Sequence, residues 1–172
     1  MRVRKDIPRL RTARLWRAVR RALAGGRAKV GFRICEFSVQ SNHVHLICEA
    51  SHHEALARGM QGFGIRFAKQ VNRALGGRRG GVLRERYATT LLKVPRQVRN
   101  CLCYVLHNAR RHGATLVGAD EFSSARTFTG WRDYCGLPPP PADEPTPVTT
   151  ARTKLLQSRW RFHGLIGPQE TH

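Results

Sequence analysis

Two histidines, His43 and His45, stand two positions apart in an apolar stretch, and their spacing suggests chemistry. Alternate residues of a β-strand point to the same side, so both imidazoles would lie on one face, about 6–7 Å apart along the strand. Two imidazoles in that arrangement can share a metal ion. The same pattern fits two hydrogen-bonded surface histidines, and spacing alone leaves both interpretations open.

A tyrosine and an asparagine form a second constellation. Tyr104 and Asn108 are four residues apart in a stretch with helical periodicity, so they share one helical face. A phenol and a carboxamide so placed could be a nucleophile and a metal-ligating oxygen. The alternative is a tyrosine packed in the core beside an asparagine on the helix surface. The neighbouring His107 and His112 are expected to be basic residues on the exposed side of this helix.

The elements that must position these residues follow from apolar spacing and from turn residues. Periodicity predicts helices over residues 8–23, 51–75 and 95–113, and a β-hairpin made of residues 30–39 and 43–50. Residues 81–93 alternate well enough for an extended segment or a strand. The sequence therefore predicts an α+β fold, which becomes a ferredoxin-like split βαβ arrangement if a strand precedes the first helix. Only residues 1–3 are available for that strand, so we expect it to be truncated.

The chain divides into three parts by composition. We expect one domain over residues 1–136, a proline-rich linker over 137–150, and a basic C-terminal tail over 151–172. The tail is too short to fold alone. Four of its apolar residues could dock on the main body: Leu155, Leu156, Trp160 and Leu165.

Charge is the strongest compositional signal. The sequence has 31 Lys and Arg against 11 Asp and Glu, a formal net charge of +20. A surplus of this size favours a polyanionic partner, and nucleic acid above all, because each cation placed near a phosphate releases condensed counterions. The basic residues are spread along the chain, so a merely solvated surface is the alternative.

Other compositional features exclude several classes of protein. A hydrophobic fraction of 41% supports a core and excludes a wholly disordered basic tail. No apolar run approaches the ~20 residues that cross a bilayer, so we expect a cytoplasmic protein without a membrane partner. The five cysteines are an odd set without a CxxC pair, which favours reduced core thiols over a zinc ribbon or disulfides.

The run SVQSNHVHLICEA, over residues 38–50, resembles the HUH motif of single-tyrosine transposases, in particular the REP-associated tyrosine transposases. The resemblance continues through RGMQGFGIRFAKQVNRALG (58–76), RERYATTLL (84–92), VRNCLCYVLHNARRHG (98–113) and SSARTFTGW (123–131), and covers most of residues 28–135. A lone HUH triplet is unspecific, but its order and spacing with a long helix and a Tyr-x-x-x-Asn helix make a fairly strong pattern. One departure is Asn-Ala-Arg at 108–110, where many relatives have Asn-Pro-Val.

The resemblance implies roles for particular residues. His43 and His45 would be the HUH ligands of a divalent cation, Mg²⁺ or Mn²⁺, with Asn108 as the third ligand, and Tyr104 would be the nucleophile. A tyrosine phenol has a reference pKa of about 10, so a cation or a base must favour its phenolate. The resemblance therefore implies a transposase-like endonuclease that nicks and rejoins single-stranded, hairpin-forming DNA through a 5′-phosphotyrosine intermediate, and it also allows a homodimer.

Two other functions stay open at this stage. A DNA- or RNA-binding protein on the same scaffold, catalytically inactive or recruited for regulation, has the same charge and helix pattern. A basic RNA-associated or ribosome-associated protein is allowed by the charge alone.

Overall fold

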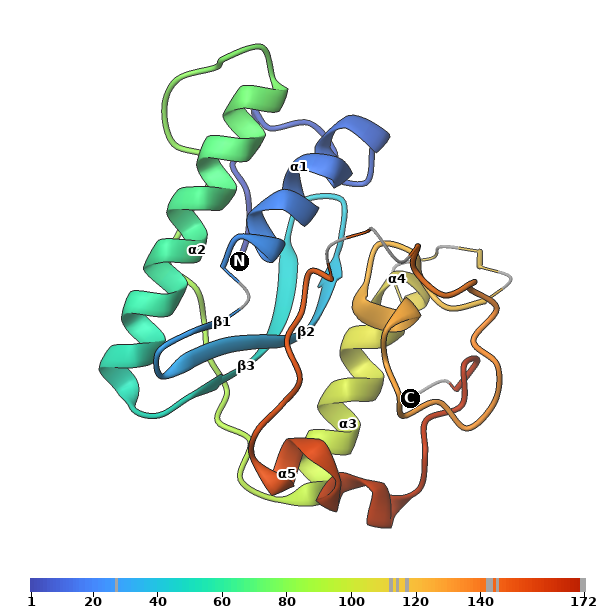
Figure 1. Ribbon diagram of the computed structural model, residues 1–172. Coiled ribbons are helices and arrows are strands. Elements are labelled where there is room, and N and C mark those ends of the chain that lie inside the picture. The colour runs from blue at the N-terminus through green and yellow to red at the C-terminus, as the bar shows by residue number, and fades with distance from the viewer. Residues whose placement is uncertain are drawn as a thin grey trace.

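A β-hairpin lies at the centre of this α+β fold (Figure 1). The computed structural model describes residues 1–26, 28–111, 113, 115–116, 118–141, 144 and 146–170. The antiparallel sheet has the order β1, β2, β3, with bounds Ala28–Lys29, Phe32–Val39 and Val44–Ala50. The helices are α1 Ala13–Ala24, α2 His53–Ala74, α3 Pro95–Leu106, α4 Asn108–Arg111 and α5 Lys154–Gln157, with 3-10 turns η1 Ser124–Arg126 and η2 Arg159–His163. The predicted hairpin is confirmed, as is the α+β class.

A β-bulge at Cys35 keeps the large apolar residues of β2 on one face of the sheet. The pairing register with β3 shifts there, so that residues on both sides of the bulge pack in the same core. These residues are Phe32, Ile34, Phe37 and Val39. Ser38 pairs with His45 and lies on the opposite face, which is the face that the candidate site uses.

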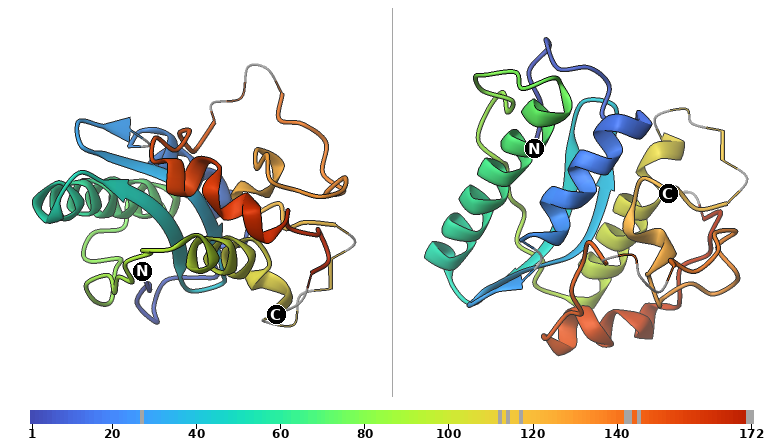
Figure 2. Two further views of the ribbon diagram at one scale, coloured as in Figure 1. Left: turned by 90° about the horizontal axis from the view of Figure 1, so that it is seen from below. Right: turned by 45° about the horizontal axis from the view of Figure 1, so that its top comes forward.

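Helices α1 and α2 lie side by side and cover the face of the sheet that carries the large apolar residues of β2 (Figures 1 and 2). Helix α1 begins at Ala13, later than the periodicity predicts, because the Thr12 side chain accepts a hydrogen bond from the Leu15 amide and caps the helix there. Within α2, Gly59 lies so close to the Phe32 ring that a Cβ atom would stand 2.1 Å from it. A glycine at this position lets the helix pack closely on β2.

The predicted helix over residues 95–113 is divided. Helix α3 ends at Leu106 and α4 begins at Asn108, with His107 as the break. The expectation of an exposed His107 is wrong: its side chain is buried, and its Nε2 donates to the carbonyl oxygen of Pro168 at 3.1 Å. Pro168 is remote in sequence, so helical periodicity could not indicate this contact. His112 lies outside the described residues.

The N-terminal residues lie between β3 and residues 82–84, as antiparallel bridges join Arg2 to His43 and Val3 to Leu83. The amide of Val3 donates to Asn42 O at 2.9 Å on one side, and Arg84 N donates to Arg2 O at 2.9 Å on the other. The expected first strand is therefore reduced to isolated bridges. Residues 81–93 contain no strand either, since Leu83 alone forms a bridge and the remainder has no regular structure.

The C-terminal segment packs against α3 in a second hydrophobic core. Trp160 is only 1% exposed, and its ring stacks on that of Phe128 with 5.8 Å between centroids. Leu155, Leu156 and Leu165 are partly buried against the same cluster, so the expected docking of these residues is observed.

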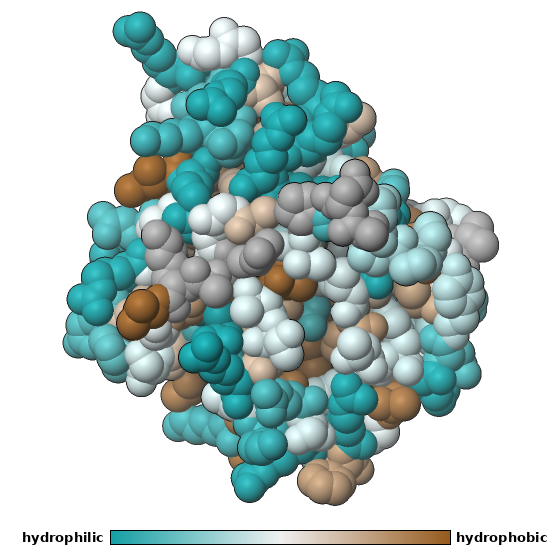
Figure 3. All heavy atoms as spheres, viewed as in Figure 1, coloured by the Kyte–Doolittle hydropathy of each residue, from teal (hydrophilic) through white to brown (hydrophobic). Residues whose placement is uncertain are grey.

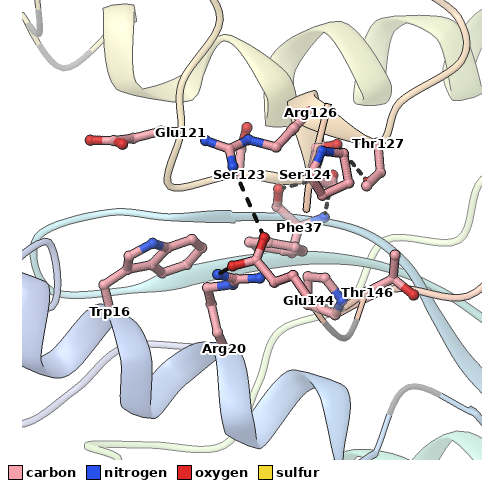
Figure 4. Close-up of a pocket in the computed structure, with 12 residues that line it drawn as sticks. Trp16, Arg20, Phe37, Glu121, Ser123, Ser124, Arg126, Thr127, Glu144 and Thr146 are labelled. Atoms are coloured by element: carbon pink, nitrogen blue, oxygen red, sulfur yellow. Dashed lines mark hydrogen bonds and ion pairs between the residues drawn. The ribbon is translucent and has the colours of Figure 1, made fainter. Parts of the chain in front are cut away.

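The described residues of the proline-rich segment contact the main body. Glu144 forms an ion pair with Arg20 of α1 and lies 4.0 Å from an Arg126 nitrogen, beside a hollow of about 60 Å³ (Figure 4). Hydrogen bonding to Arg20 lowers the pKa of the Glu144 carboxyl. The amide of Thr149 donates to Ile34 O at 2.9 Å. The segment therefore crosses the surface beside β2 and is attached at both places.

Two further observations concern the class of protein. In the described part of the chain, no helix combines the length and apolar character needed to cross a membrane. None of the five cysteines forms a disulfide, and burial raises the pKa of the Cys48 thiol to about 12.

Candidate active site

His43, directly before β3, and His45, within it, converge at their outer nitrogens. The Nε2 atoms of His43 and His45 are 3.0 Å apart, and the two rings meet edge to face with 4.8 Å between centroids. Because β3 alternates regularly, both histidines lie on the face of Ile47, which packs with α3, while Leu46 packs toward α1 and α2. The strand therefore presents the histidine pair to the α3 side of the sheet.

Asn42 sets the tautomer of the first histidine. The His43 Nδ1 donates to Asn42 Oδ1 at 2.8 Å, so in the neutral ring the proton is on Nδ1 and the lone pair is on Nε2. A hydrogen bond of this kind orients metal-binding histidines and makes their other ring nitrogen a better ligand. In the sequence Asn42 directly precedes His43, but nothing in the sequence alone indicates a role for it.

The donor set of the pair fits a divalent cation. Two ligand atoms at about 2.1 Å from an octahedral cation, in adjacent positions, are about 3.0 Å apart, which is the separation seen here. The same separation also fits a hydrogen-bonded pair, in which the Nε2–H of one ring donates to the Nε2 of the other. Among the described residues, no group of three or more His, Cys, Asp or Glu side chains could hold a metal ion. A third protein ligand among the described residues would be of another residue type.

Tyr104 of α3 lies against the histidine pair of its own chain. Its ring meets that of His45 edge to face, with 5.3 Å between centroids and an interplanar angle of 88°. The side chain is solvent-accessible, since Tyr104 is 37% exposed. The guanidinium of Arg111, in α4, lies over the Tyr104 ring at 5.2 Å from its centroid. A cation at this distance can stabilise negative charge on the phenol or on a bound phosphate.

Asn108 is a buried residue and not the surface asparagine of the alternative interpretation. It is 0% exposed, and within the part of the chain that the structure describes, neither Oδ1 nor Nδ2 has a hydrogen-bond partner. A buried amide without partners costs roughly 1–3 kcal/mol. The alternative of a core tyrosine beside an exposed asparagine is therefore wrong on both counts. The structure brings His43, His45 and Tyr104 together; it gives Asn108 no hydrogen bond to the histidines, but its unpartnered oxygen is a candidate third ligand.

A buried carboxyl on the same face of the sheet was not indicated by the sequence. Glu36 pairs with Ile47, next to the Ser38 and His45 pair, and its Oε2 is buried without a partner among the described residues, although the residue as a whole is half-buried. Burial raises the pKa of Glu36 to about 8, against a smaller opposing effect from its hydrogen bond with Ser124. A glutamate in a strand is usually exposed, and the bulge that turns it inward left no signal in the sequence.

Comparisons with known proteins add no identification: no family model matches the chain, and neither the curated proteins nor the solved structures contain a match.

Proposed function

We propose that this chain is a metal-dependent, single-tyrosine endonuclease and strand transferase of the transposase type, acting on single-stranded, hairpin-forming DNA. One observation carries the proposal: an accessible tyrosine lies edge to face against a pair of histidines whose Nε2 atoms converge. A nucleophile beside a cation site is an arrangement that supports phosphoryl transfer.

The fold that we propose for this activity is the ferredoxin-like split βαβ arrangement. It is supported by the order of segments across the sheet, in which residues 82–84 neighbour residues 1–3, which neighbour β3, which pairs with β2. It is also supported by the position of α1 and α2 on one face. In this arrangement Arg2 and Val3, with their isolated bridges, occupy the position of the first strand.

The cation would be held by His43 Nε2, His45 Nε2 and Asn108 Oδ1. Bound there, Mg²⁺ or Mn²⁺ would polarise the scissile phosphate and neutralise charge that develops on its oxygens. Two imidazoles and an amide leave open coordination positions and do not select between the two metals. Asn42 holds the His43 ring in the tautomer that such binding needs.

Tyr104 carries the covalent step in this proposal. Its Oη attacks phosphorus, the bond from phosphorus to the 3′ oxygen breaks, the 5′ phosphate stays on the tyrosine, and the proton lost from Oη is balanced by one gained at the 3′-hydroxyl. The phosphodiester energy is kept in the tyrosyl ester, so rejoining needs no external energy source. Arg111, which lies over the Tyr104 ring, would neutralise charge on the bound phosphate.

A nucleic-acid-binding protein without strand transfer is the second candidate, and the net charge of +20 favours it as much as the enzyme. Covalent capture separates the two. Purified protein is incubated with labelled hairpin oligonucleotides and Mn²⁺, and the products are run on a denaturing gel. The enzyme gives a labelled adduct that survives denaturation; a set of hairpins with varied flanking strands that yields no adduct would favour the binding protein.

A further inference from the structure

A basic groove runs between α1 and α2 on the outer side of the helix layer. Three arginines of α1, two polar side chains of α2 and one alanine from each helix line it, around a hollow of about 330 Å³. These residues define the α1–α2 groove: Arg14, Arg17 and Arg21 from α1, and Gln70 and Arg73 from α2. In Figure 3, which has the view of Figure 1, the upper part of the molecule is largely hydrophilic.

The arginines of the groove have no acidic partners among the residues that the structure describes. Of the ion pairs between described residues, none involves Arg14, Arg17, Arg21 or Arg73, and all four are exposed. Within α1 they are spaced i, i+3 and i+7, so neighbouring guanidinium groups repel one another along one face. The first turn of α1 has no acidic residue either, although that end of a helix favours negative charge. A bound polyanion would remove both costs.

The groove lies on the other side of the sheet from the candidate active site. Helices α1 and α2 pack on the face of Leu46, whereas His45 and Tyr104 lie on the face of Ile47. A helix alone is about 10–12 Å across, so a phosphate in the groove cannot be the phosphate that Tyr104 attacks. A nucleic acid bound in the groove would therefore use a different part of its backbone from the part at Tyr104.

The lining indicates which kind of nucleic acid fits. Proteins that bind single strands use aromatic side chains on which bases stack. The groove has arginines, one glutamine and two alanines, and no aromatic residue among its described lining. Guanidinium groups and an amide can donate to phosphate oxygens of two neighbouring backbone positions, and they do so without reading a base.

We propose that the α1–α2 groove binds the phosphodiester backbone of double-stranded DNA, at a distance from the site of strand cleavage. The inference extends the proposed function, on which it rests for the identity of the substrate: a hairpin has a duplex stem for the groove and a single strand for Tyr104. The groove then holds the stem while the opposite face of the sheet acts on the strand.

The test compares two double variants with equal loss of charge. Arg17→Gln with Arg73→Gln removes one guanidinium from each helix of the groove. Arg152→Gln with Arg159→Gln, beside α5 at the far end of the molecule, is the control, since both residues are exposed and in no ion pair among the described residues. Fluorescence anisotropy measures binding to a blunt DNA duplex, to an unstructured DNA strand and to an RNA duplex over a salt series, after thermal melting confirms that all variants are folded.

The groove variant should bind the DNA duplex about tenfold more weakly, with a log–log salt slope shallower by about 1.8, the value for two phosphate contacts on B-form DNA. The control variant should keep both quantities close to those of the unchanged protein, and binding to the unstructured strand should change less. Equal losses in the two variants, or a larger loss for the RNA duplex, would overturn the proposal. If the unchanged protein forms no covalent adduct while the groove results are as expected, the proposed function alone fails and the groove proposal stands.

Discussion

The Tyr104 ring stands edge to face against the His45 ring, with 5.3 Å between centroids, although one residue belongs to α3 and the other to β3. This contact gives the tyrosine a fixed position relative to the histidine pair while its side chain stays accessible to solvent. Both residues belong to one chain, so a single copy brings the two rings together.

Tyr104→Phe should abolish covalent attachment of DNA and leave binding affinity within about twofold, because it deletes the nucleophilic oxygen and keeps the ring against His45. The measurement is the yield of denaturant-resistant adduct beside an anisotropy titration. Tyr134→Phe is the matched control, since Tyr134 is 75% exposed and outside the site, and it should form adduct at the normal yield. Adduct at that yield from Tyr104→Phe would remove this residue from the mechanism.

His43→Ala and His45→Ala should each eliminate metal-stimulated cleavage, because each removes one of the two nitrogens that converge. Asn108→Ala should raise the Mn²⁺ concentration needed for half-maximal cleavage by about 10- to 100-fold, since a poorer site is still partly occupied. Mn²⁺ titrations of cleavage, with isothermal calorimetry of Mn²⁺ alone, measure both effects.

The Asn108 variant has a second readout. Its amide has no hydrogen-bond partner among the described residues, so its removal should lower the melting temperature little. Normal cleavage rates and unchanged Mn²⁺ dependence in all three variants would show that these residues form no metal site.

The sequence predicts part of this site well, because the chemistry of β3 is local. Alternation along a strand is enough to put His43 and His45 on one face. The expected shared helical face of Tyr104 and Asn108 is not observed in the same way, because the helix breaks at His107 and the two residues belong to α3 and α4. The exposure of Tyr104 and Asn108 depends on what α3 and α4 pack against, which the sequence does not show. The alternative of a core tyrosine beside a surface asparagine is reversed in the structure, since the tyrosine is accessible and the asparagine is buried.

The features that the sequence does not predict come from contacts between distant segments. The division of the third helix coincides with the burial of His107 against Pro168, and the N-terminal bridges depend on residues 82–84. The bulge at Cys35 turns Glu36 toward the α3 face, which a strict alternation over β2 cannot indicate. In each case the local pattern is compatible with several arrangements, and tertiary packing selects one.

Glu36 should make the stability of the fold depend on pH. Its pKa is raised from 4.5 to about 8 by burial, so the folded state keeps the proton in a range where the unfolded chain has lost it. The free energy of unfolding should therefore fall as the pH rises from about 4.5 to about 8, by at most about 1.4 kcal/mol per pH unit from this group. Urea titrations across that range should show that the free energy of unfolding of Glu36→Gln depends less on pH than that of the unchanged protein. An equal pH dependence in the two proteins would contradict the raised pKa of Glu36.

Trp160→Ala should destabilise the protein by about 3–5 kcal/mol, because it empties a fully buried site in the core that joins the C-terminal segment to α3. Phe162→Ala is the control from the same segment: Phe162 is 87% exposed, and its loss should change the stability by less than about 0.5 kcal/mol. Urea denaturation measures both. Similar effects in the two variants would mean that the C-terminal segment does not dock through Trp160.

A hairpin with a flanking single strand should bind more tightly than an unstructured strand of equal length, and the difference should persist as salt is raised. The net charge of +20 attracts any nucleic acid, with a log–log salt slope near roughly −0.7 per phosphate contact on a single strand. Bulk attraction of this kind is screened beyond about 10 Å at 0.1 M salt, whereas contacts made directly to phosphates and bases at a recognition site are screened less. The measurement is a pair of anisotropy titrations from about 0.05 to 0.3 M salt, with Tyr104→Phe used so that no covalent product forms. Equal affinity for both strands across the series would indicate an unspecific basic binder, even if the histidines still held a metal.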